Sequence, residues 1–458
     1  MDRPLSAPGE PTLDRGLGPW ASASIVVGTV IGTGVFLKTA VMAQLGGSPL
    51  WVLVAWGVAA ALSFTGAMTY SELGGMFPSA GGEYVYLRQG YSPFMGYLYA
   101  WNRFWIATPG SIAAYAVGSA TFLSTAVPLD RFGGIRAVGI GLVVVFTAVN
   151  CLNVRSGGRL QTVLTVMKIV MIAGLAAGAL FTPHGSWSHL AGGGGFPGAS
   201  AFGAMVLAAL WAYDGWNNLP MAAGEIRDPQ KTLPRATIYG MFAVLATYAL
   251  VNLGYFHALP LSEIVTASSE AHPDAPAVAA KAASVFLGGP AQALLAIAMT
   301  LSAISAMNGS MLTGARVPYA VAKDGLAPAA LARLSRGARV PAISVVVQGG
   351  LAVALALVGN FDQLTDAVVF ASWLFYALNA GSVLLLRRRE PSRPRPFRVP
   401  GFPVVPIVFI GLAGWLIINT IVTSLEPSLL GLGMTALGGG VYLAMRSRAR
   451  PPGDDPAP

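Results

Sequence analysis

Residues 25–36, which read IVVGTVIGTGVF, decide the fold of this chain of 458 residues. The stretch is apolar enough to lie in a lipid bilayer, yet it carries three glycines within seven residues. Each glycine weakens an α-helix by about 1 kcal/mol. Glycines at this spacing also let two helix backbones pack closely, so this stretch alone leaves an interrupted helix and a tightly packed one both open.

A second stretch favours the interrupted helix. Residues 210–216 read LWAYDGW and place a carboxylate, a glycine and three aromatic side chains near the middle of another apolar run. Among the acidic residues we place only Asp214 deep within a predicted span, where a charge costs about 2.5–3.5 kcal/mol and marks a candidate functional site. The two stretches lie in the first and sixth predicted spans. An inverted repeat of five helices would put two interrupted helices in matching positions.

The composition indicates a polytopic α-helical membrane protein. Hydrophobic residues make up 54% of the chain and charged residues 10%, against about 25% charged in an average soluble domain. Disorder is excluded because disordered chains are poor in apolar residues. Twelve spans of about 20 residues would use about 240 residues and leave no room for a folded soluble domain. Cys151 is the single cysteine, which excludes an internal disulfide framework and a cysteine-rich metal site.

Twelve apolar runs, bounded by charged residues and by proline and glycine, are predicted to cross the membrane as helices. Their centres lie near Val30, Ala61, Pro109, Val143, Met171, Ala208, Ala246, Ile304, Ala352, Phe375, Leu412 and Leu437. We expect an N-terminal cytoplasmic tail at 1–16, a single transmembrane domain at 17–450 and a disordered C-terminal tail at 451–458.

The basic residues predict the orientation of the chain. Lys38, Arg131, Arg136 and Lys281 fall in loops on one side, Arg103 and Lys168 fall inside spans, and the other basic residues fall on the opposite side. Basic loops face the cytoplasm, so both termini are predicted there, in a multi-pass protein of the cell (inner) membrane. Glu72 and Glu83 lie on this side and are expected to shape a gate.

Nucleic-acid binding is not expected from the net charge of +9, because no basic domain stands apart from the membrane.

Interrupted helices expose main-chain groups that lipid cannot satisfy. N–H groups at the N-terminus of a half-helix favour an anion and freed carbonyls favour a cation, so the two breaks suit a zwitterion about the size of an amino acid. We expect the N–H groups of residues 33–35 to face its carboxylate, and the carbonyls of Val30, Trp211 and Asp214 to face its ammonium group. The predicted binding residues in these two segments are Val30, Ile31, Thr33, Gly34, Val35, Trp211, Tyr213 and Asp214.

Several motifs follow one another in a recognisable order. They are IGTGVF at 31–36, WAYDGWN at 211–217, GEIRDP at 224–229, LPRA at 233–236, NGS at 308–310 with Arg316, WLFY at 373–376 and RPRP at 393–396. Together they resemble the L-type amino acid transporter (LAT)-like branch of the amino acid–polyamine–organocation (APC) superfamily, over residues from about 17 to about 406. Motifs in matching order are a more specific signal than any one of them.

The resemblance implies an alternating-access transporter with a LeuT-like fold of twelve helices. Five helices are repeated in inverted topology, at about 17–182 and 200–388, and helices eleven and twelve follow at about 402–446. The substrate would lie between helices one, three, six, eight and ten, with Trp211 closing over it from outside and Asp214 beside its side chain. Branch members with WAYD at this place accept cationic as well as neutral amino acids. Ser372 is at a helix-ten position that carries an amide in some relatives, so side-chain preference cannot be transferred there.

Two basic side chains fall inside predicted spans. Lys168 lies roughly 14 Å along its helix from Arg159, at about 1.5 Å per residue, where it could either snorkel to the headgroups or act within the protein. In the resembling family a lysine at this place sits where sodium-coupled relatives hold a sodium ion and touches the unwound part of helix one, which implies sodium-independent transport. Arg103 is either a snorkelling charge or a partner for a buried carboxylate, and its family counterpart is often acidic.

The leading hypothesis is a sodium-independent exchanger of small or medium neutral L-amino acids, with cationic ones as further candidates because of Asp214. Proton- or sodium-coupled symport of amino acids or polyamines, and an amino-acid sensor without transport, are the alternatives.

An enzyme is not expected, because no nucleophile–base pair appears in the spans. No cofactor is expected, and no metal, because the four histidines lack ligand spacing. Animal relatives join a glycoprotein through a loop cysteine that residues 128–136 lack, so no disulfide-linked subunit is expected.

Overall fold

The structure is a computed structural model that describes residues 12–269, 271–272, 275–358, 361–423 and 425–448, with side chains left undescribed at 361–371, 423, 425–428, 430 and 447–448. Within these ranges the chain is helical, apart from loops and two isolated β-bridges that join Leu17 to Ile226 and Ser269 to His272. The tail expected at 451–458, and most of the tail expected at 1–16, lie outside the described residues.

The first half of the chain forms α1 (Pro19–Val30), α2 (Gly34–Gly46), α3 (Pro49–Met76), α4 (Glu83–Gly90), α5 (Pro93–Asn102), the π-helical segment η1 (Arg103–Ala107), α6 (Thr108–Ser124), η2 (Leu129–Phe132), α7 (Gly134–Leu152), α8 (Val154–Phe181) and η3 (Trp187–Ala191). The second half forms α9 (Ala199–Ala212), α10 (Asn218–Met221), η4 (Ala223–Glu225), α11 (Pro229–Ala258), α12 (Leu261–Val265), α13 (Val278–Leu287), α14 (Ala291–Gly314), α15 (Arg316–Lys323), η5 (Ala329–Ala332), α16 (Ala342–Val358), α17 (Phe361–Arg389), α18 (Val404–Thr423) and α19 (Leu425–Arg448). Each of the twelve predicted span centres lies within one of these helices.

Within the described residues, eight helical stretches are long and apolar enough to cross a membrane, by length and composition. They are Pro19–Gly46, Pro49–Met76, Pro93–Ser124, Gly134–Leu152, Val154–Phe181, Pro229–Ala258, Ala291–Lys323 and Val404–Val422. Large apolar side chains point outward from these helices, among them Val170, Phe242 and Ile418, each more than 60% exposed. Exposing such an apolar surface to water is unfavourable in free energy, whereas exposing it to lipid is not. The chain is therefore an all-helical, multi-pass membrane protein.

Two helical stretches are interrupted at the positions that the sequence marks. α1 ends at Val30 and α2 begins at Gly34, so residues 31–33 leave the helix. α9 ends at Ala212 and α10 begins at Asn218, with turns between them. Gly215 in this second break has φ +113°, a conformation that only glycine adopts readily. The break in each stretch is local, and the chain on both sides of it stays helical.

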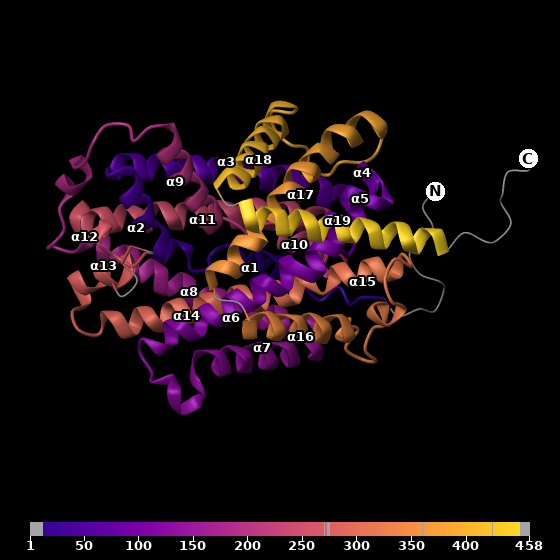
Figure 1. The fold of residues 1–458 in the computed structure, drawn as a ribbon, viewed down its shortest axis with the longest axis horizontal. Coiled ribbons are helices and arrows are strands. Elements are labelled where there is room, and N and C mark those ends of the chain that lie inside the picture. The colour runs from indigo at the N-terminus through magenta and orange to yellow at the C-terminus, as the bar shows by residue number, and fades with distance from the viewer. Residues whose placement is uncertain (1–11, 270, 273–274, 359–360, 424, 449–458) are drawn as a thin grey trace, which may run out of the picture.

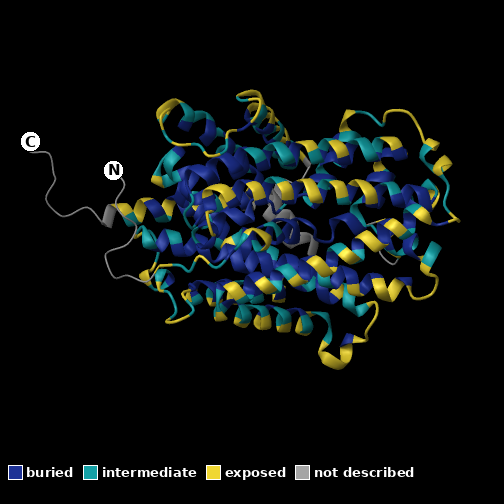
Figure 2. Ribbon diagram, turned by 180° about the vertical axis from the view of Figure 1, so that it is seen from behind, coloured by how far each residue is buried: buried dark blue, intermediate teal, exposed yellow. Residues whose placement is uncertain are grey.

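The interrupted stretches lie beside one another in the middle of the bundle. α1 packs against α8, α11 and α14 (Figure 1) and also touches α10, while α2 packs against α9. Buried residues fill this interior and exposed ones follow the outer helices (Figure 2). The arrangement places both breaks where neighbouring helices, rather than lipid, surround the freed main-chain groups.

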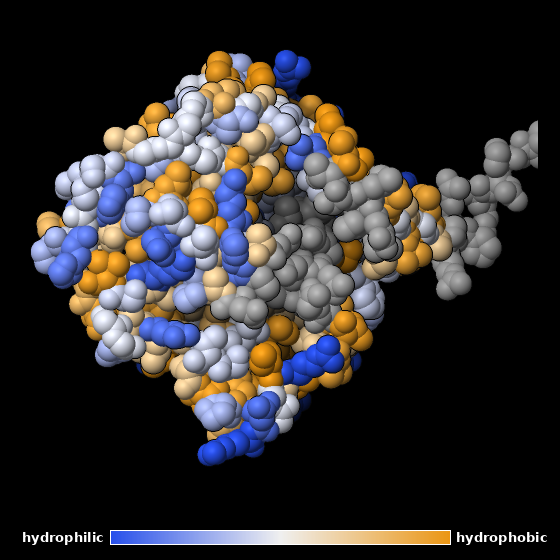
Figure 3. Space-filling model, turned by 60° about the vertical axis from the view of Figure 1, so that its left-hand side comes forward, coloured by the Kyte–Doolittle hydropathy of each residue, from blue (hydrophilic) through white to orange (hydrophobic). Residues whose placement is uncertain are grey.

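The two ends of the bundle differ in their chemistry. The end that carries α4 and α15, at the right of Figure 1, is called the basic end and is defined by Arg88, Arg316, Arg387, Arg393 and Arg395. Four of these guanidinium groups pair with carboxylates of neighbouring elements there, and Arg393 pairs with Glu390 in its own segment. The opposite end carries α12 and α13, and hydrophilic side chains gather there between hydrophobic ones (Figure 3).

The pair between Glu225 and Arg316 predicts a large loss of stability when one partner is removed. The two contacts measure 2.6 and 2.9 Å, and both side chains are fully buried. Glu225→Gln strands a buried guanidinium, which costs about 3–5 kcal/mol. We expect a clear fall in the melting temperature of the purified protein in detergent, measured by tryptophan fluorescence. In the control, Glu263→Gln, the carboxylate is 57% exposed and the melting temperature should hardly change; equal falls in the two variants would contradict the prediction.

Candidate functional site

The first break leaves the carbonyl end of α1 without a full set of helical partners. The N–H of Ile31 still donates to Val27 O at 2.9 Å, and the N–H of Gly32 donates to Val30 O at 2.8 Å. The last four carbonyls of a helix have no intrahelical N–H, and a carbonyl keeps a second lone pair even where one is used. Acceptors are therefore concentrated between Gly28 and Gly32, in the middle of the bundle.

Lys168 on α8 and Ser302 on α14 satisfy much of this carbonyl cluster. The Lys168 ammonium donates to Gly28 O at 2.9 Å, to Ser302 O at 3.1 Å and to Ile31 O. The Ser302 hydroxyl lies 3.0 Å from Ile31 O and 2.8 Å from Gly32 O. Only 1% of Lys168 is exposed, so its side chain does not snorkel. The Lys168 ammonium therefore bonds to groups inside the protein and not to lipid headgroups.

Tyr248 and Thr29 connect the two breaks. The Tyr248 hydroxyl on α11 lies 3.2 Å from Val30 O and 2.9 Å from Ala212 O, which are the last carbonyls of α1 and α9. The Thr29 hydroxyl lies 2.9 Å from Gly215 O. One phenol and one hydroxyl thus hold the ends of both interrupted stretches against each other.

The backbones of the two breaks approach so closely that glycine is required. A Cβ on Gly34 would lie 2.5 Å from Ala212 Cβ and 2.8 Å from Ala212 Cα. A Cβ on Gly215 would lie 2.9 Å from Thr29 O. Any larger residue must push the two backbones apart, because these neighbours are main-chain atoms or the first atom of a side chain.

The amide end of the first break belongs to α2. Thr33 is the N-cap, and Gly34 and Val35 form the first turn, whose N–H groups have no intrahelical acceptor. The Thr33 hydroxyl is buried and has no hydrogen-bond partner among the described residues. Amide donors at the positive end of a helix dipole favour an anion such as a carboxylate.

Asp214 lies in the second break, where Tyr376 of α17 donates to its carboxylate at 2.8 Å. Ser372 is buried on the same helix, one turn before Tyr376. The Trp211 ring is half-buried beneath the Lys38 ammonium, which lies 4.9 Å from the ring centroid. Tyr213 is buried, with its ring packed against Trp56 and Tyr248.

The structure therefore brings the predicted residues of both breaks into one place. In the described part of the chain, no group of three or more His, Cys, Asp or Glu side chains could hold a metal ion. The sequence did not indicate that Tyr248 and Ser302 contact the breaks, because a single polar residue in an apolar run carries no information about the residue that it contacts. Glu83, which we expect to shape a gate, is fully buried. The hydroxyls of Tyr70 and Tyr99 donate to it at 2.7 and 2.5 Å.

The family of amino acid permeases matches residues 17–436 of this chain. This protein belongs to that family, which consists of transporters and not of enzymes. It is 30% identical to the serine/threonine exchanger SteT of Bacillus subtilis over 95% of this chain and 98% of that one. It is 29% identical to the human b(0,+)-type amino acid transporter 1 over 90% and 84% of the two chains. It is 27% identical to the rabbit large neutral amino acids transporter small subunit 2 over 95% and 81%.

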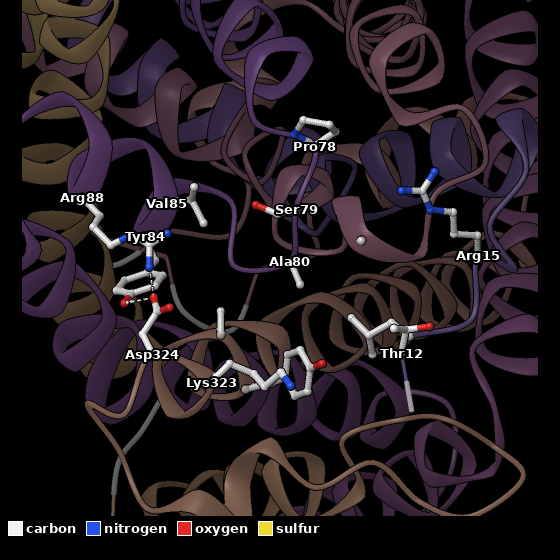
Figure 4. A pocket seen from close by; sticks show the side chains of 14 residues that line it. Thr12, Arg15, Pro78, Ser79, Ala80, Tyr84, Val85, Arg88, Lys323 and Asp324 are labelled. Carbon is white, nitrogen blue, oxygen red and sulfur yellow. Dashed lines mark hydrogen bonds and ion pairs between the residues drawn. The ribbon is translucent and has the colours of Figure 1, made fainter. Parts of the chain in front are cut away.

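At its basic end the permease has a cavity of about 390 Å³ that is separate from the two breaks. Arg88, Tyr84 and Asp324 meet on one side of it, and Arg15 and Thr12 lie on the other (Figure 4). Arg88 pairs with Asp324, which also accepts from the Tyr84 hydroxyl at 2.5 Å. Burial, and then the Asp324 carboxylate, raise the pKa of the Tyr84 phenol, so it stays a donor at neutral pH. The residues of the two breaks do not line this cavity.

The contact between Gly34 and Ala212 predicts that a larger residue at position 34 disables the permease. Gly34→Val forces the breaks apart, and overpacking of this kind costs about 1–3 kcal/mol, which corresponds to roughly ten- to hundredfold in binding. We expect uptake of a labelled amino-acid mixture into proteoliposomes to fall by about that factor. Gly174→Val is the control, since a Cβ there meets nothing within 4 Å. Undiminished uptake in Gly34→Val would be incompatible with a site built on this contact.

Proposed function

We propose that this permease exchanges L-amino acids across the membrane by alternating access, without sodium. Small and medium neutral amino acids are the proposed substrates, with cationic ones as further candidates because of Asp214. The observation that carries the proposal is the meeting of the two breaks, which Tyr248 and Thr29 hold together with a set of amides on one side and a set of carbonyls on the other. The similarity to a serine/threonine exchanger supports the same class of substrate.

We propose that a zwitterion binds between the breaks. Its carboxylate takes the N–H groups of Thr33, Gly34 and Val35, and the carbonyls of Val30, Trp211 and Asp214 accept from its ammonium group. The Val30 carbonyl has a lone pair for this beyond the one that faces Tyr248. These interactions need main-chain atoms common to all L-amino acids, which supports a site whose selectivity lies in the surrounding side chains.

The remaining binding residues are proposed to enclose the substrate. Ile31 continues the carbonyl segment, Trp211 closes over the substrate from outside, and Tyr213, Asp214 and Ser372 border its side chain. The buried positions of Asp214 and Ser372, on the second break and on α17, support this assignment.

For the whole chain we propose twelve spans with a LeuT-like fold, comprising inverted repeats at about 17–182 and 200–388 and two further helices at about 402–446. The twelve expected centres within helices, and a break in the first helix of each repeat, support this organisation.

The concentration of arginine at the basic end supports a cytoplasmic location for that end and for both termini. Cys151, the only cysteine, lies at the end of α7 and outside the loop 128–136, which supports the absence of a disulfide-linked subunit.

Lys168 is proposed to take the place of a sodium ion. Its ammonium contacts carbonyls of α1 and α14 as a bound cation would, but it is tethered to α8 and cannot leave. A tethered ammonium at this position removes the reason for sodium to bind there. A counter-substrate, rather than a sodium gradient, is then proposed to drive transport.

Counterflow in proteoliposomes tests the proposed function. We expect purified protein to exchange external labelled L-serine for internal L-serine, L-threonine or L-alanine at the same rate in sodium chloride and in choline chloride. Competition with all twenty amino acids then ranks the substrates. A requirement for a sodium gradient would exclude the proposed mechanism, a requirement for a proton gradient would indicate symport, and binding without counterflow would indicate a sensor.

Removal of the tethered ammonium tests the role of Lys168. Lys168→Ala abolishes three charge-assisted hydrogen bonds, each worth about 1.5–3 kcal/mol. Even one such loss corresponds to roughly tenfold or more in an equilibrium constant. We therefore expect serine counterflow to fall by at least about that factor, with the protein still eluting as a folded species in size-exclusion chromatography. Lys281→Ala, which removes an ammonium bonded near the α12–α13 end, should leave counterflow intact; similar rates for the two variants would refute the assignment.

A further inference from the structure

Arg103 is a buried cation beside the second break. It begins the π-helical segment η1, which interrupts the regular helix between α5 and α6. Such segments are frequent at functional sites because they displace one residue from the helical register. Arg103 is 8% exposed, and its guanidinium donates to the side-chain oxygen of Asn218 on α10. Its Nε atom is buried and has no partner among the described residues.

The elements around Arg103 carry two buried carboxylates. Asn218 lies one turn beyond Asp214, and η1 itself contacts α17, whose Tyr376 donates to Asp214. On the other side, Tyr99, one turn before Arg103, donates to Glu83. Asn218, which accepts from Arg103, and Asn217, which donates to Glu83 at 3.0 Å, are neighbours in the chain and place the guanidinium close to the surroundings of both carboxylates.

The two carboxylates have different supplies of neutral donors. Four donors surround Glu83: the phenols of Tyr70 and Tyr99, and the amides of Asn217 and Asn379 at 3.0 and 3.4 Å. Among the side chains that the structure describes, Asp214 has one such donor, Tyr376 at 2.8 Å. A buried carboxylate with few donors depends more strongly on a nearby cation. Arg103 therefore matters most for the charge of Asp214, which the proposed function places beside the substrate side chain.

We propose that Arg103 is a specificity-determining residue, whose buried positive charge offsets Asp214 and makes the site select neutral over cationic amino acids. This inference rests on the proposed function and narrows its substrate class. Without Arg103 the carboxylate of Asp214 would attract a lysine or arginine side chain. With Arg103 in place, such a side chain meets a like charge that stays inside the protein, because Arg103 is buried on η1.

Exchange of labelled substrates with charge variants tests this inference. Arg103→Gln removes the charge and keeps a side chain that can bond to Asn218. At an effective dielectric constant of about 20, one unit charge several ångströms away changes the preference for a cation by roughly tenfold or more. We expect the ratio of L-lysine to L-serine counterflow to rise by about that factor in Arg103→Gln. Arg103→Lys, which keeps the charge, should retain the ratio of the unmodified protein.

Two further variants separate charge from structure. Asn218→Ala removes the hydrogen-bond partner of Arg103 and keeps its charge, so the lysine-to-serine ratio should not rise. Asp214→Asn leaves Arg103 without a counter-charge at the second break, so L-aspartate counterflow should exceed L-asparagine counterflow, a preference that loss of repulsion from Asp214 alone would not give. This variant tests the inference even if Arg103→Gln does not fold, as judged by size-exclusion chromatography.

The outcomes distinguish this inference from the proposed function. An unchanged lysine-to-serine ratio in Arg103→Gln would overturn the inference, as would an equal rise in Asn218→Ala, while serine counterflow by the unmodified protein would still support the exchanger. If Arg103→Gln does not fold, an aspartate-to-asparagine ratio that stays below one in Asp214→Asn would overturn it. Lack of serine counterflow by the unmodified protein would refute the proposed function itself.

Discussion

Main-chain groups that leave a helix inside a membrane must find partners within the protein, and this requirement organises the whole molecule. Lipid offers no hydrogen bonds, so each freed amide or carbonyl that stays unpaired costs several kcal/mol. The chain places both breaks in the middle of the bundle, where α8, α11 and α14 pack against α1. These three helices supply donors to the first break, and Tyr248 of α11 and Thr29 of α1 supply them to the second.

The donors to the carbonyls at the end of α1 come from three different helices, so the first break is a junction at which these helices are bonded together. Lys168 comes from α8, Tyr248 from α11 and Ser302 from α14, and all three contact the few carbonyls at the end of α1. A movement of α1 must therefore exchange bonds with three neighbours at once. A junction of this kind suits a transporter that switches between a small number of states, since packed networks change in steps and do not deform continuously.

Buried charged side chains, like the freed main-chain groups, are bonded to partners within the protein. Glu225 and Arg316 are fully buried and form an ion pair with two contacts, and Glu83 is fully buried among neutral donors. Asp214 lies in the second break, where Tyr376 donates to it, and Arg103 lies beside that break. Charged groups thus lie beside the proposed substrate position, while ion pairs between neighbouring elements join the basic end.

The sequence by itself determined the membrane class, the twelve helical centres and the positions of the two breaks, because apolar runs and glycines act locally. It also indicated the amides of residues 33–35, since any helix that starts at Gly34 frees them. Only the tertiary structure decided what Lys168 and Arg103 contact, and that Tyr248 and Ser302 contact the breaks. Their partners lie far along the chain, as with the 137 residues between Lys168 and Ile31 and the 271 between Ser302 and Ile31. No local pattern records a hydrogen bond between such distant residues, so it emerges only when the helices pack.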